Sequence, residues 1–435
     1  MAHNTQPGGE GVAVLGAGEP PVTGQRHVFW ASYFGWLLDG FDTTVYAFVL
    51  VPALKYLLPA SGVSTAETSF FGLTFFAVFL AGWGSSFLVG FLADRFGRLR
   101  TLGLSILLYA LGTLASGLAH NLTEFGIARL VTGFGLGAEW FIGGTGVAES
   151  FPEDKRDIWA GRFHSAWYVG FILAAAIVPF LAPVIGWRAV FFIGVAPALL
   201  LFYIRFSATE PYRWSGAKQR LGAQMTMLRS ARTILNRTYR RQTLLLAFIM
   251  IPIIAGLYGG TLFVPTALTD LDKVAHTGLS TSYLVAVGGS IIAALTIAGC
   301  LVMPYLARWI GRRGALAIFL AFMAVGLVVV FEVEFKASNM GGFLAALTLL
   351  GIGGADFSVF SLWLPEIYPT EARAGGFGFV TTIGRYAGAA LTFGIGAMNA
   401  AIGLGNSLAV TAAFFIIALL LLPFTTETKG QRMPE

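Results

Sequence analysis

Charge and cysteine are both scarce in this chain of 435 residues. Only 11% of the residues are Asp, Glu, Lys or Arg, whereas an ordinary soluble domain has about a quarter. The single cysteine, Cys300, excludes a disulfide framework and a thiolate metal site. The sequence has no His, Cys and Asp spacing typical of a metal site, no nucleophile motif and no soluble catalytic stretch. We therefore expect no metal and no cofactor, and an integral-membrane enzyme is the disfavoured alternative.

Apolar residues take the place of the missing charge. They make up 56% of the chain, and the mean hydropathy is +0.75. A helix that spans a bilayer needs roughly 20 mostly apolar residues, and by this measure the sequence predicts an all-α membrane protein with twelve transmembrane segments. These segments lie near residues 28–53, 67–92, 100–119, 122–148, 157–180, 187–206, 241–268, 280–303, 314–332, 341–365, 375–400 and 405–424.

The basic residues predict the topology, because Lys and Arg accumulate on cytoplasmic loops. Twelve spans put both termini on one side. Of the 28 Lys and Arg, the expected outer connections hold only Lys55, Arg188, Lys273 and Lys336, and the membrane holds Arg129 and Arg385. All the others lie on inner segments, so we expect cytoplasmic termini, a bacterial inner (plasma) membrane and no nucleic-acid partner.

The longest inner connection divides the chain into two sets of six helices. We interpret this basic connection as a solvated linker in preference to a binding patch. The first residues are rich in Gly and Pro and lack a signal-peptide core. The predicted parts are a disordered cytoplasmic tail at 1–25, a six-helix bundle at 26–206, the linker at 207–240, a second bundle at 241–428 and a cytoplasmic tail at 429–435.

The two halves repeat each other. Gly-Ala-Glu139-Trp140 and the following Ala148-Glu149-Ser-Phe-Pro152 recur 217 residues later as Gly-Ala-Asp356-Phe357 and Pro365-Glu366-Ile-Tyr-Pro369. The stretch Asp94-Arg95-Phe-Gly97-Arg98 recurs after 214 residues as Arg308-Trp309-Ile-Gly311-Arg312. Parallel six-helix repeats with a site between them near the midplane are typical of rocker-type secondary transporters.

Several of these stretches resemble motifs of the major facilitator superfamily. Gly90-Phe-Leu-Ala-Asp94-Arg95-Phe-Gly97-Arg98 resembles its signature loop between helices 2 and 3, and Arg129-Leu-Val-Thr-Gly133-Phe-Gly135 its helix 4 motif. Pro365-Glu366-Ile-Tyr-Pro369 resembles the helix 10–11 motif, and Thr426-Glu427-Thr428-Lys429-Gly430 the closing motif of sugar-porter-like members. The resemblance implies two pseudo-symmetric six-helix bundles, alternating access and a monomer.

The resemblance also narrows the branch. Asp39-Gly40-Phe41-Asp42 is similar to the helix 1 signature of the sialate:H+ and aromatic acid:H+ symporters. Gly-Ala-Glu139-Trp140 resembles the sialate branch, which includes lactate and pyruvate carriers. Helix 7 reads Gly256-Leu257-Tyr258-Gly259-Gly260 and lacks the sugar-porter Gln-Gln pair, which counts against a hexose. The second signature loop has Arg308 where the first has an acid.

Asp39 and Asp42 are the first candidates for chemistry. An acid in hydrocarbon costs about 2.5–3.5 kcal/mol on insertion scales, so it persists where it has protein, water or a function to face. The two acids are three residues apart and share a helix face. Two carboxylates at such a short distance cannot both ionise cheaply in a low dielectric. At least one of them is therefore expected to bind a proton near neutrality. A structural, hydrogen-bonded acid at a helix interface is the alternative.

Arg129 is the expected partner of Asp42, because a rise of ~1.5 Å per residue puts both at a similar depth. The hypothesis is that protonating Asp42 releases Arg129 and so couples proton binding to the rocking equilibrium. Asp39 is then a second proton site or a cavity-lining residue. Glu139, in the inner third of helix 4, is a second proton site or half of an inner gate.

Arg385, near the midplane of helix 11, is expected to hold a substrate carboxylate by a two-pronged hydrogen bond. The alternative is an ion pair between helices with Glu139 or Asp356. The remaining candidates for the substrate cavity are His164, Trp167, Tyr168, Tyr258 and Tyr386, which also fit ordinary core packing. Asp356 is a further candidate, with the same alternatives as Glu139, a second proton site or half of an inner gate.

Acid beside base at the inner helix ends, once per repeat, predicts ion pairs that form when the inner side closes and break when it opens. The predicted gate residues are Asp94, Arg95, Arg98, Glu149, Arg156, Glu366 and Arg373. Plain basic anchors are the alternative, and they do not explain the repeated Glu-x-x-Pro.

The sequence thus predicts a proton-coupled symporter that imports an organic anion. The expected substrate is a small carboxylate such as lactate, pyruvate or glycolate, or an acidic sugar such as sialate, and the other partners are protons and the lipid bilayer. A proton-driven exporter and a carrier of neutral or zwitterionic solutes are the alternatives within transport.

Overall fold

The computed structural model describes residues 22–58, 65–195, 199–335 and 339–435. Within these ranges the chain forms helices and short helical turns and no strand. Most of the predicted tail at 1–25, and the outer Lys336, lie outside the described residues. The first helix begins at Val22, so residues 22–25 are helical rather than disordered.

The first half makes six membrane crossings, with the second crossing divided between α2 and α3 by one turn at Ser86. In α6, Gly186 has a φ of 79° and separates the fifth crossing from the sixth, which continues into α7. The elements are α1 (Val22–Leu57), α2 (Thr65–Ser85), α3 (Phe87–Phe96), α4 (Arg98–Leu118), α5 (Leu122–Ser150), α6 (Arg156–Ile193) and α7 (Leu200–Ser207).

The second half repeats this plan. In α12, Gly311 has a φ of 85° and separates the eighth crossing from the ninth, at the repeat position of Gly97. The elements are α10 (Arg240–Gly260), a 3₁₀ turn (Thr261–Phe263), α11 (Val264–Ala275), α12 (Thr281–Val328), a π-helical stretch (Val329–Glu334), α13 (Met340–Gly353), α14 (Asp356–Ile367), a 3₁₀ turn (Thr370–Ala372), α15 (Arg373–Ile402), α16 (Leu404–Val410), α17 (Ala412–Leu421) and a 3₁₀ turn (Leu422–Phe424).

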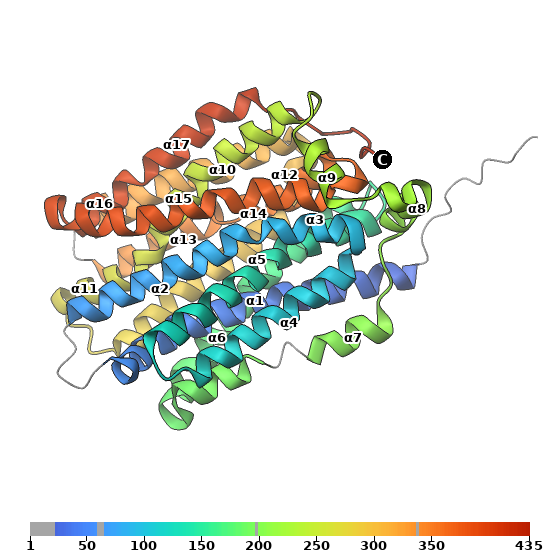
Figure 1. The fold of residues 1–435 in the computed structure, drawn as a ribbon. Helices are drawn as coiled ribbons and strands as arrows, with labels where there is room; N and C mark the ends of the chain where they lie inside the picture. The colour runs from blue at the N-terminus through green and yellow to red at the C-terminus, as the bar shows by residue number, and fades with distance from the viewer. Residues whose placement is uncertain (1–21, 59–64, 196–198, 336–338) are drawn as a thin grey trace, which may run out of the picture.

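The linker between the halves is not a plain solvated loop. It folds into α8 (Tyr212–Leu221), a 3₁₀ turn (Gly222–Gln224) and α9 (Met227–Ile234). Figure 1 shows α8, α9 and the C-terminus gathered at one end of the bundle. We call this end, which also holds the turns at Gly97 and Gly311, the basic end.

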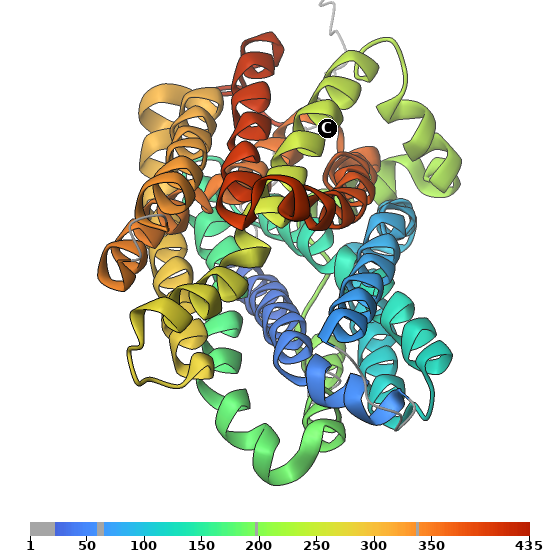
Figure 2. The ribbon, with the colours of Figure 1, turned by 90° about the vertical axis from the view of Figure 1, so that its left-hand side faces the viewer.

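The twelve crossings form two bundles of six, which lie side by side in the end-on view of Figure 2. In the described residues, eight helical stretches are long and apolar enough to cross a membrane. Two of these stretches are divided by a kink, at Gly186 and at Gly311, and each includes residues of two consecutive crossings. The bundles meet where α15 packs on α2 and α3, and where α12 packs on α6. The predicted fold class is therefore confirmed.

Glycine permits a very close contact between α1 and α6. A Cβ on Gly40 would collide with the carbonyl oxygen of Trp167, and a Cβ on Gly170 would collide with that of Leu37. The backbone of α6 therefore lies directly against the part of α1 that carries the two acids.

Candidate functional site

Asp39 lies buried between α1 and α6. Its Oδ1 accepts hydrogen bonds from Trp167 Nε1 at 3.1 Å and from the Thr43 hydroxyl at 3.3 Å. Its Oδ2 is buried and has no hydrogen-bond partner. A buried polar atom without a partner is costly, so this oxygen is a natural place for a proton.

Asp42, one turn further along α1, is also buried and faces α4 and α5. Its Oδ1 accepts a hydrogen bond from the Thr113 hydroxyl at 2.9 Å. Its Oδ2 lies 4.0 Å from Arg129 Nη1, at the outer limit of an ion pair, and makes no hydrogen bond. The structure thus brings together Asp42 and Arg129, which were predicted to pair from their similar depth, but the contact is loose.

Arg129 is held by more than its acid. Its Nε donates to the Ser116 hydroxyl at 2.8 Å, and its Nη2 donates to the Thr132 hydroxyl at 3.0 Å. Three aromatic rings surround the guanidinium with centroids 5.0–5.9 Å from Cζ, those of Tyr46, Phe125 and Phe191. Such cation–π contacts stabilise a desolvated cation, so Arg129 keeps most of its partners when Asp42 is protonated.

Glu139 lies buried on α5, with its carboxylate against Gly35 of α1. Neither of its oxygens has a hydrogen-bond partner, because the nearby Ser105 hydroxyl donates to the Gly135 carbonyl at 2.6 Å instead. Among its described residues, the first half therefore contains three buried carboxyl groups with at least one unpartnered oxygen each.

Arg385 reaches from α15 of the second half to aromatic rings of the first. Its guanidinium stacks over the Trp83 ring, 4.2 Å from the centroid, and lies 5.8 Å from that of Trp140. It donates to the Thr381 carbonyl and lies near Tyr258, while its Nε is buried and unpartnered. In the described residues neither Glu139 nor Asp356 forms an ion pair with Arg385, which counts against a purely structural role.

His164 joins the halves through a small polar cluster. Its Nδ1 lies 3.0 Å from the Ser361 hydroxyl, which also accepts the Trp140 Nε1 hydrogen bond at 2.7 Å. His164 and Trp140 belong to the first half and Ser361 to α14 of the second. Because the serine proton is free for His164, the neutral imidazole is satisfied at this nitrogen.

The other predicted cavity residues are spread along the same interface. Tyr168 donates to the Gly354 carbonyl at 3.2 Å, across the halves. Asp356 accepts from the N–H of Phe357 at 2.7 Å, and its other oxygen is unpartnered. Tyr386 differs, because it is 44% exposed and its hydroxyl pairs with that of Ser85 on α2 at 2.8 Å, away from the His164 cluster.

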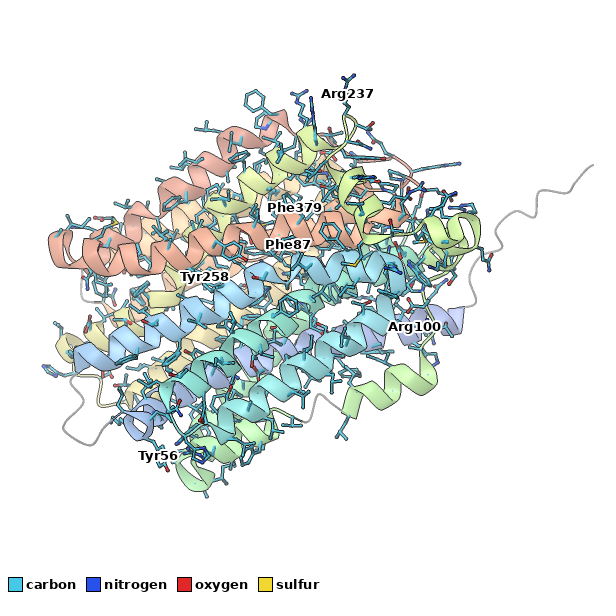
Figure 3. All side chains as sticks on the ribbon, viewed as in Figure 1. Tyr56, Phe87, Arg100, Arg237, Tyr258 and Phe379 are labelled. Atoms are coloured by element: carbon cyan, nitrogen blue, oxygen red, sulfur yellow. The ribbon has the colours of Figure 1, made fainter. Side chains whose placement is uncertain are left out.

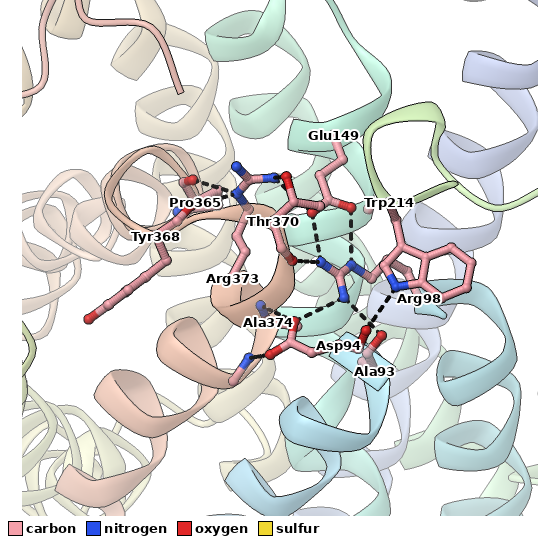
Figure 4. A network of polar contacts seen from close by, with 12 residues as sticks. Ala93, Asp94, Arg98, Glu149, Trp214, Pro365, Tyr368, Thr370, Arg373 and Ala374 are labelled. Atoms are coloured by element: carbon pink, nitrogen blue, oxygen red, sulfur yellow. Dashed lines mark hydrogen bonds and ion pairs between the residues drawn. The ribbon is translucent and has the colours of Figure 1, made fainter. Parts of the chain in front are cut away.

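At the basic end, Glu149 binds two buried arginines from opposite halves (Figure 4). It accepts hydrogen bonds from Arg98 at 2.7 and 3.0 Å and from Arg373 at 2.8 Å. Arg98 also pairs with Asp94 at 2.9 Å, and Asp94 accepts the backbone N–H groups of Ala374 and Gly375 at 3.0 and 2.9 Å. The network closes the basic end between α3, α5 and α15.

The second half has a corresponding network around Glu366. This carboxylate pairs with Arg312 at 2.7 and 2.9 Å and with the Thr428 hydroxyl at 2.6 Å, and Arg156 of the first half lies 3.8 Å away. Of the predicted gate residues, only Arg95 is outside both networks. It is exposed and its guanidinium lies over the Phe96 ring.

Two carboxylates that were not predicted from the sequence bind helix N-termini. Glu210 accepts the backbone N–H groups of Arg98, Leu99 and Arg100 at 2.6–3.2 Å, and Glu427 accepts those of Arg312 and Arg313 at 3.0 Å. Each follows a threonine, and the two Thr-Glu pairs are 217 residues apart. That spacing equals the offset of the Glu139 and Asp356 repeat, so the repeat could have indicated that the two glutamates have equivalent positions.

The sequence reasoning also missed the contacts of the linker and of Arg308. Ser230 on α9 donates to Asp94 Oδ2 at 2.6 Å, and Trp214 on α8 donates to the Asp94 carbonyl at 2.9 Å. Arg308 binds both carboxylate oxygens of Asp157 at the start of α6. No spacing rule connects these residues, because the pairs come from separate elements.

Two six-helix bundles around a buried, charged interface, sealed at one end by ion pairs across the halves, define a membrane transporter of the secondary type. The family model described as Major Facilitator Superfamily matches residues 33–334. The chain belongs to this superfamily and is a multi-pass membrane protein.

Known relatives match along nearly the whole chain. The probable 4-methylmuconolactone transporter of Cupriavidus pinatubonensis is 29% identical over 95% of this chain and 92% of its own. The sialic acid transporter NanX of Escherichia coli is 28% identical over 93% and 95%. Among solved structures, the proton:xylose symporter XylE is similar with a TM-score of 0.75, 19% identity and coverage of 94% and 98%, which supports the fold.

Proposed function

We propose that this transporter is a symporter that imports an organic anion together with protons. The observation that carries the proposal is the pair of buried acids on α1, Asp39 and Asp42, each with one oxygen that has no hydrogen-bond partner. Membrane-embedded acids that face protein are functional by default. We propose Asp42 as the coupling site and Asp39 and Glu139 as further proton-binding candidates.

The surroundings of Arg129 refine how protonation acts. Because Ser116, Thr132 and three rings retain the guanidinium, a proton on Asp42 does not set Arg129 free. It removes the attraction between α1, which carries the acid, and the α4–α5 pair, which carries Thr113 and Arg129. Proton binding therefore biases how α1 packs in its bundle, and through that the rocking equilibrium.

Arg385 is the proposed anion-binding residue. Its buried, unpartnered Nε is a donor that a substrate carboxylate satisfies, and the two indoles beside it offer flat apolar surfaces. These neighbours favour a planar organic acid over a hydroxylated one. Two relatives are named as transporters of 4-methylmuconolactone and of sialic acid. Both named substrates agree with a carboxylate, but they differ from each other in shape.

The proposed orientation places the basic end and both termini in the cytoplasm, in a bacterial inner membrane, with the chain acting as a monomer. The closed ion-pair networks at the basic end then correspond to a carrier whose inner side is shut. Opening requires the His164–Ser361 contact and the bonds of Glu149 across the halves to break.

Uptake by proteoliposomes under an imposed pH gradient tests the proposal. Muconate, nicotinate, benzoate, lactate, glycolate and sialate form the panel, and a transported substrate should accumulate when the lumen is alkaline. In the same assay, Asp42→Asn should abolish accumulation but retain exchange of substrate between equilibrated compartments. Accumulation by Asp42→Asn at the level of the unaltered protein would overturn the coupling role.

Arg385→Lys tests the anion site separately, because it keeps the charge and loses the planar fork. The expected result is at least a tenfold rise in the apparent KM for a carboxylate, with the pH dependence of exchange unchanged. An unaltered KM would assign Arg385 to the packing of Trp83 and Tyr258 instead.

A further inference from the structure

The linker helix α9 carries a surface that the transport mechanism does not use. Its buried side holds Ser230 and Ile234, which face the bundle. Its opposite side carries Leu228 and Arg232 at i and i+4, the spacing of one helix face, and Leu235 follows directly after the last residue of the helix. Leu228 is 57% and Leu235 is 49% exposed, and Arg232 is exposed between them. The two exposed leucines and the arginine between them form a small patch that is both apolar and basic.

Four arginines near this face have no acidic partner. In the part of the chain that the structure describes, Arg232, Arg237, Arg240 and Arg241 are exposed and form no ion pair. By contrast, Arg98, Arg156, Arg312 and Arg373 at the same end are all paired. Figure 3 shows Arg237 at the outer edge of the molecule, pointing away from the bundle. The charge is therefore available to an external anion.

A groove on α9 supplies hydrogen-bond donors next to that charge. It has a volume of about 310 Å³ and is lined by Thr226, Leu228, Arg229, Arg232, Thr233 and Asn236. Guanidinium and hydroxyl donors in a shallow groove suit a phosphate ester. The neighbouring leucines favour a phosphate that is attached to acyl chains.

The position of α9 agrees with the membrane surface. It ends at Ile234, and the candidate transmembrane span of α10 begins six residues later at Arg240. Amphipathic helices that carry Arg on their polar side and Leu toward the acyl chains lie in the headgroup layer, and clusters of Lys or Arg directly beside a transmembrane helix bind anionic lipids. From these observations we propose that the outer face of α9 binds the headgroup of an anionic phospholipid.

The buried face of α9 connects this lipid site to the gate. Ser230 donates to Asp94 Oδ2 at 2.6 Å, and Asp94 is the residue that holds the first turn of α15. Arg229 lies 3.7 Å from Glu371 in the turn before α15. A lipid that seats α9 on the bundle therefore stabilises the closed basic end. This role does not depend on which substrate is carried or on proton coupling.

The test uses the full-length protein with Cys300→Ser, reconstituted in phosphatidylcholine vesicles that contain 0–40% phosphatidylglycerol. A spin label at Thr238→Cys, an exposed site beside α9, reports lipid binding by its mobility. In a second protein, labels at Arg95→Cys and Trp309→Cys, one in each half, report the closure of the basic end by their distance. Neither readout requires transport.

The expected result is that phosphatidylglycerol immobilises the label at residue 238 and shortens the distance between labels 95 and 309. Arg232→Gln should raise the half-saturating lipid fraction about fivefold, and Arg232→Gln with Arg237→Gln further, since each arginine near an anionic surface contributes about 1 kcal/mol. Arg220→Gln is the matched control, because Arg220 is an exposed linker arginine that is paired with Glu435. Ser230→Ala should preserve the response at residue 238 and abolish the response of the gate distance.

Several results would overturn the proposal. Equal weakening by Arg220→Gln and Arg232→Gln would mean an unspecific attraction to net charge. Inorganic phosphate that reproduces the effect in pure phosphatidylcholine would mean a free-anion site. No change in the double arginine variant, when its gel-filtration profile matches that of the unaltered protein, would leave α9 without a lipid role.

Discussion

Asp94 and Arg308 occupy the same position in the two repeats, yet one is an acid buried to 1% exposure and the other a base whose side chain is 46% exposed. Asp94 crosses to the first turn of α15 and accepts the N–H groups of Ala374 and Gly375. Arg308 crosses to the first turn of α6 and binds Asp157, which occupies the repeat position of Ala374. We call these two contacts the first and the second latch. Each latch holds the start of a helix in the opposite half, but the first uses an acid where the second uses a base.

The exchange has a physical basis at the helix N-terminus. An N-terminus attracts negative charge, and in the first latch the carboxylate comes from the opposite half. In the second latch Asp157 already accepts the N–H of Ile158 at 2.8 Å, so the helix provides its own acid and the opposite half supplies the base. The repeat therefore preserves the position of the contact rather than the sign of its charges.

Burial makes the two latches unequal in strength. Exposed ion pairs are worth about 0–1 kcal/mol, whereas removing one member of a buried pair costs about 3–5 kcal/mol. The α12–α6 contact should therefore yield first when the basic end opens, and the α3–α15 contact should be the main barrier. The following experiments test this inequality.

The largest effect is expected from Glu149→Ala. This change leaves two buried arginines, Arg98 and Arg373, without their shared acid, and it should lower stability by about 3–5 kcal/mol. The repeat mate, Glu366→Ala, leaves Arg312, which is closer to water, and Arg156, which keeps a contact with Glu153 at 3.6 Å, and should cost less. Thermal unfolding in detergent, followed by the distance between labels at residues 95 and 309, measures both. An equal or larger effect of Glu366→Ala would mean that burial does not make the Glu149 network the stronger of the two.

A redesign of the second latch tests the exchange of charge directly. Arg308→Asp alone places two acids opposite each other and should shift the population toward the open basic end about fivefold, as expected for about 1 kcal/mol. Arg308→Asp together with Asp157→Ala recreates the arrangement of the first half, an acid facing an uncapped helix start, and should restore closure. The label distance reports the populations. If the double variant opens as far as the single one, the two latches are not equivalent.

The fold was predictable because its signals are local or repeated. Apolar segments of the length of a bilayer gave the crossings, and the copies around Glu139 and Asp356 gave the two halves. The pairing of Asp42 with Arg129 was accessible from their similar depth, because the rise per residue is fixed. Depth does not give the direction in which a side chain points, so the stacking of Arg385 on Trp83 was not predictable.

The contacts of the linker were not predictable for a different reason. Ser230 and Trp214 reach Asp94 from the linker helices, whose sequences contain no apolar stretch of the length of a bilayer. Short basic helices of this kind are expected to be solvated. Arg95 shows the opposite error, because it shares a motif with Asp94 and Arg98 but faces outward. A motif fixes the residue types near a gate, while the helix face decides which of them meet.

The smallest effect concerns Glu210 and Glu427, which bind equivalent helix starts in different surroundings. Burial raises the pKa of Glu210 above its usual value, despite three backbone N–H donors. Burial acts on Glu427 as well, but the N–H groups of Arg312, Arg313 and Lys429 outweigh it and the pKa of Glu427 is lowered. A carboxyl with a lowered pKa stabilises the fold above its unfolded pKa and loses that contribution as the pH falls through the folded value. One with a raised pKa has the opposite slope.

Glutamine variants should separate these two cases. Glu427→Gln should cost a few tenths of a kcal/mol at pH 7, because the site is partly screened by water, and the cost should vanish as the pH falls below about 4. Glu210→Gln should cost less at pH 7, since the neutral amide avoids the burial penalty and its oxygen still accepts the N–H groups of Arg98 and Leu99. Unfolding midpoints between pH 3.5 and 7.5 provide the measurement. Parallel pH profiles for the two variants would mean that the capping sites, unlike the latches, are equivalent in both halves.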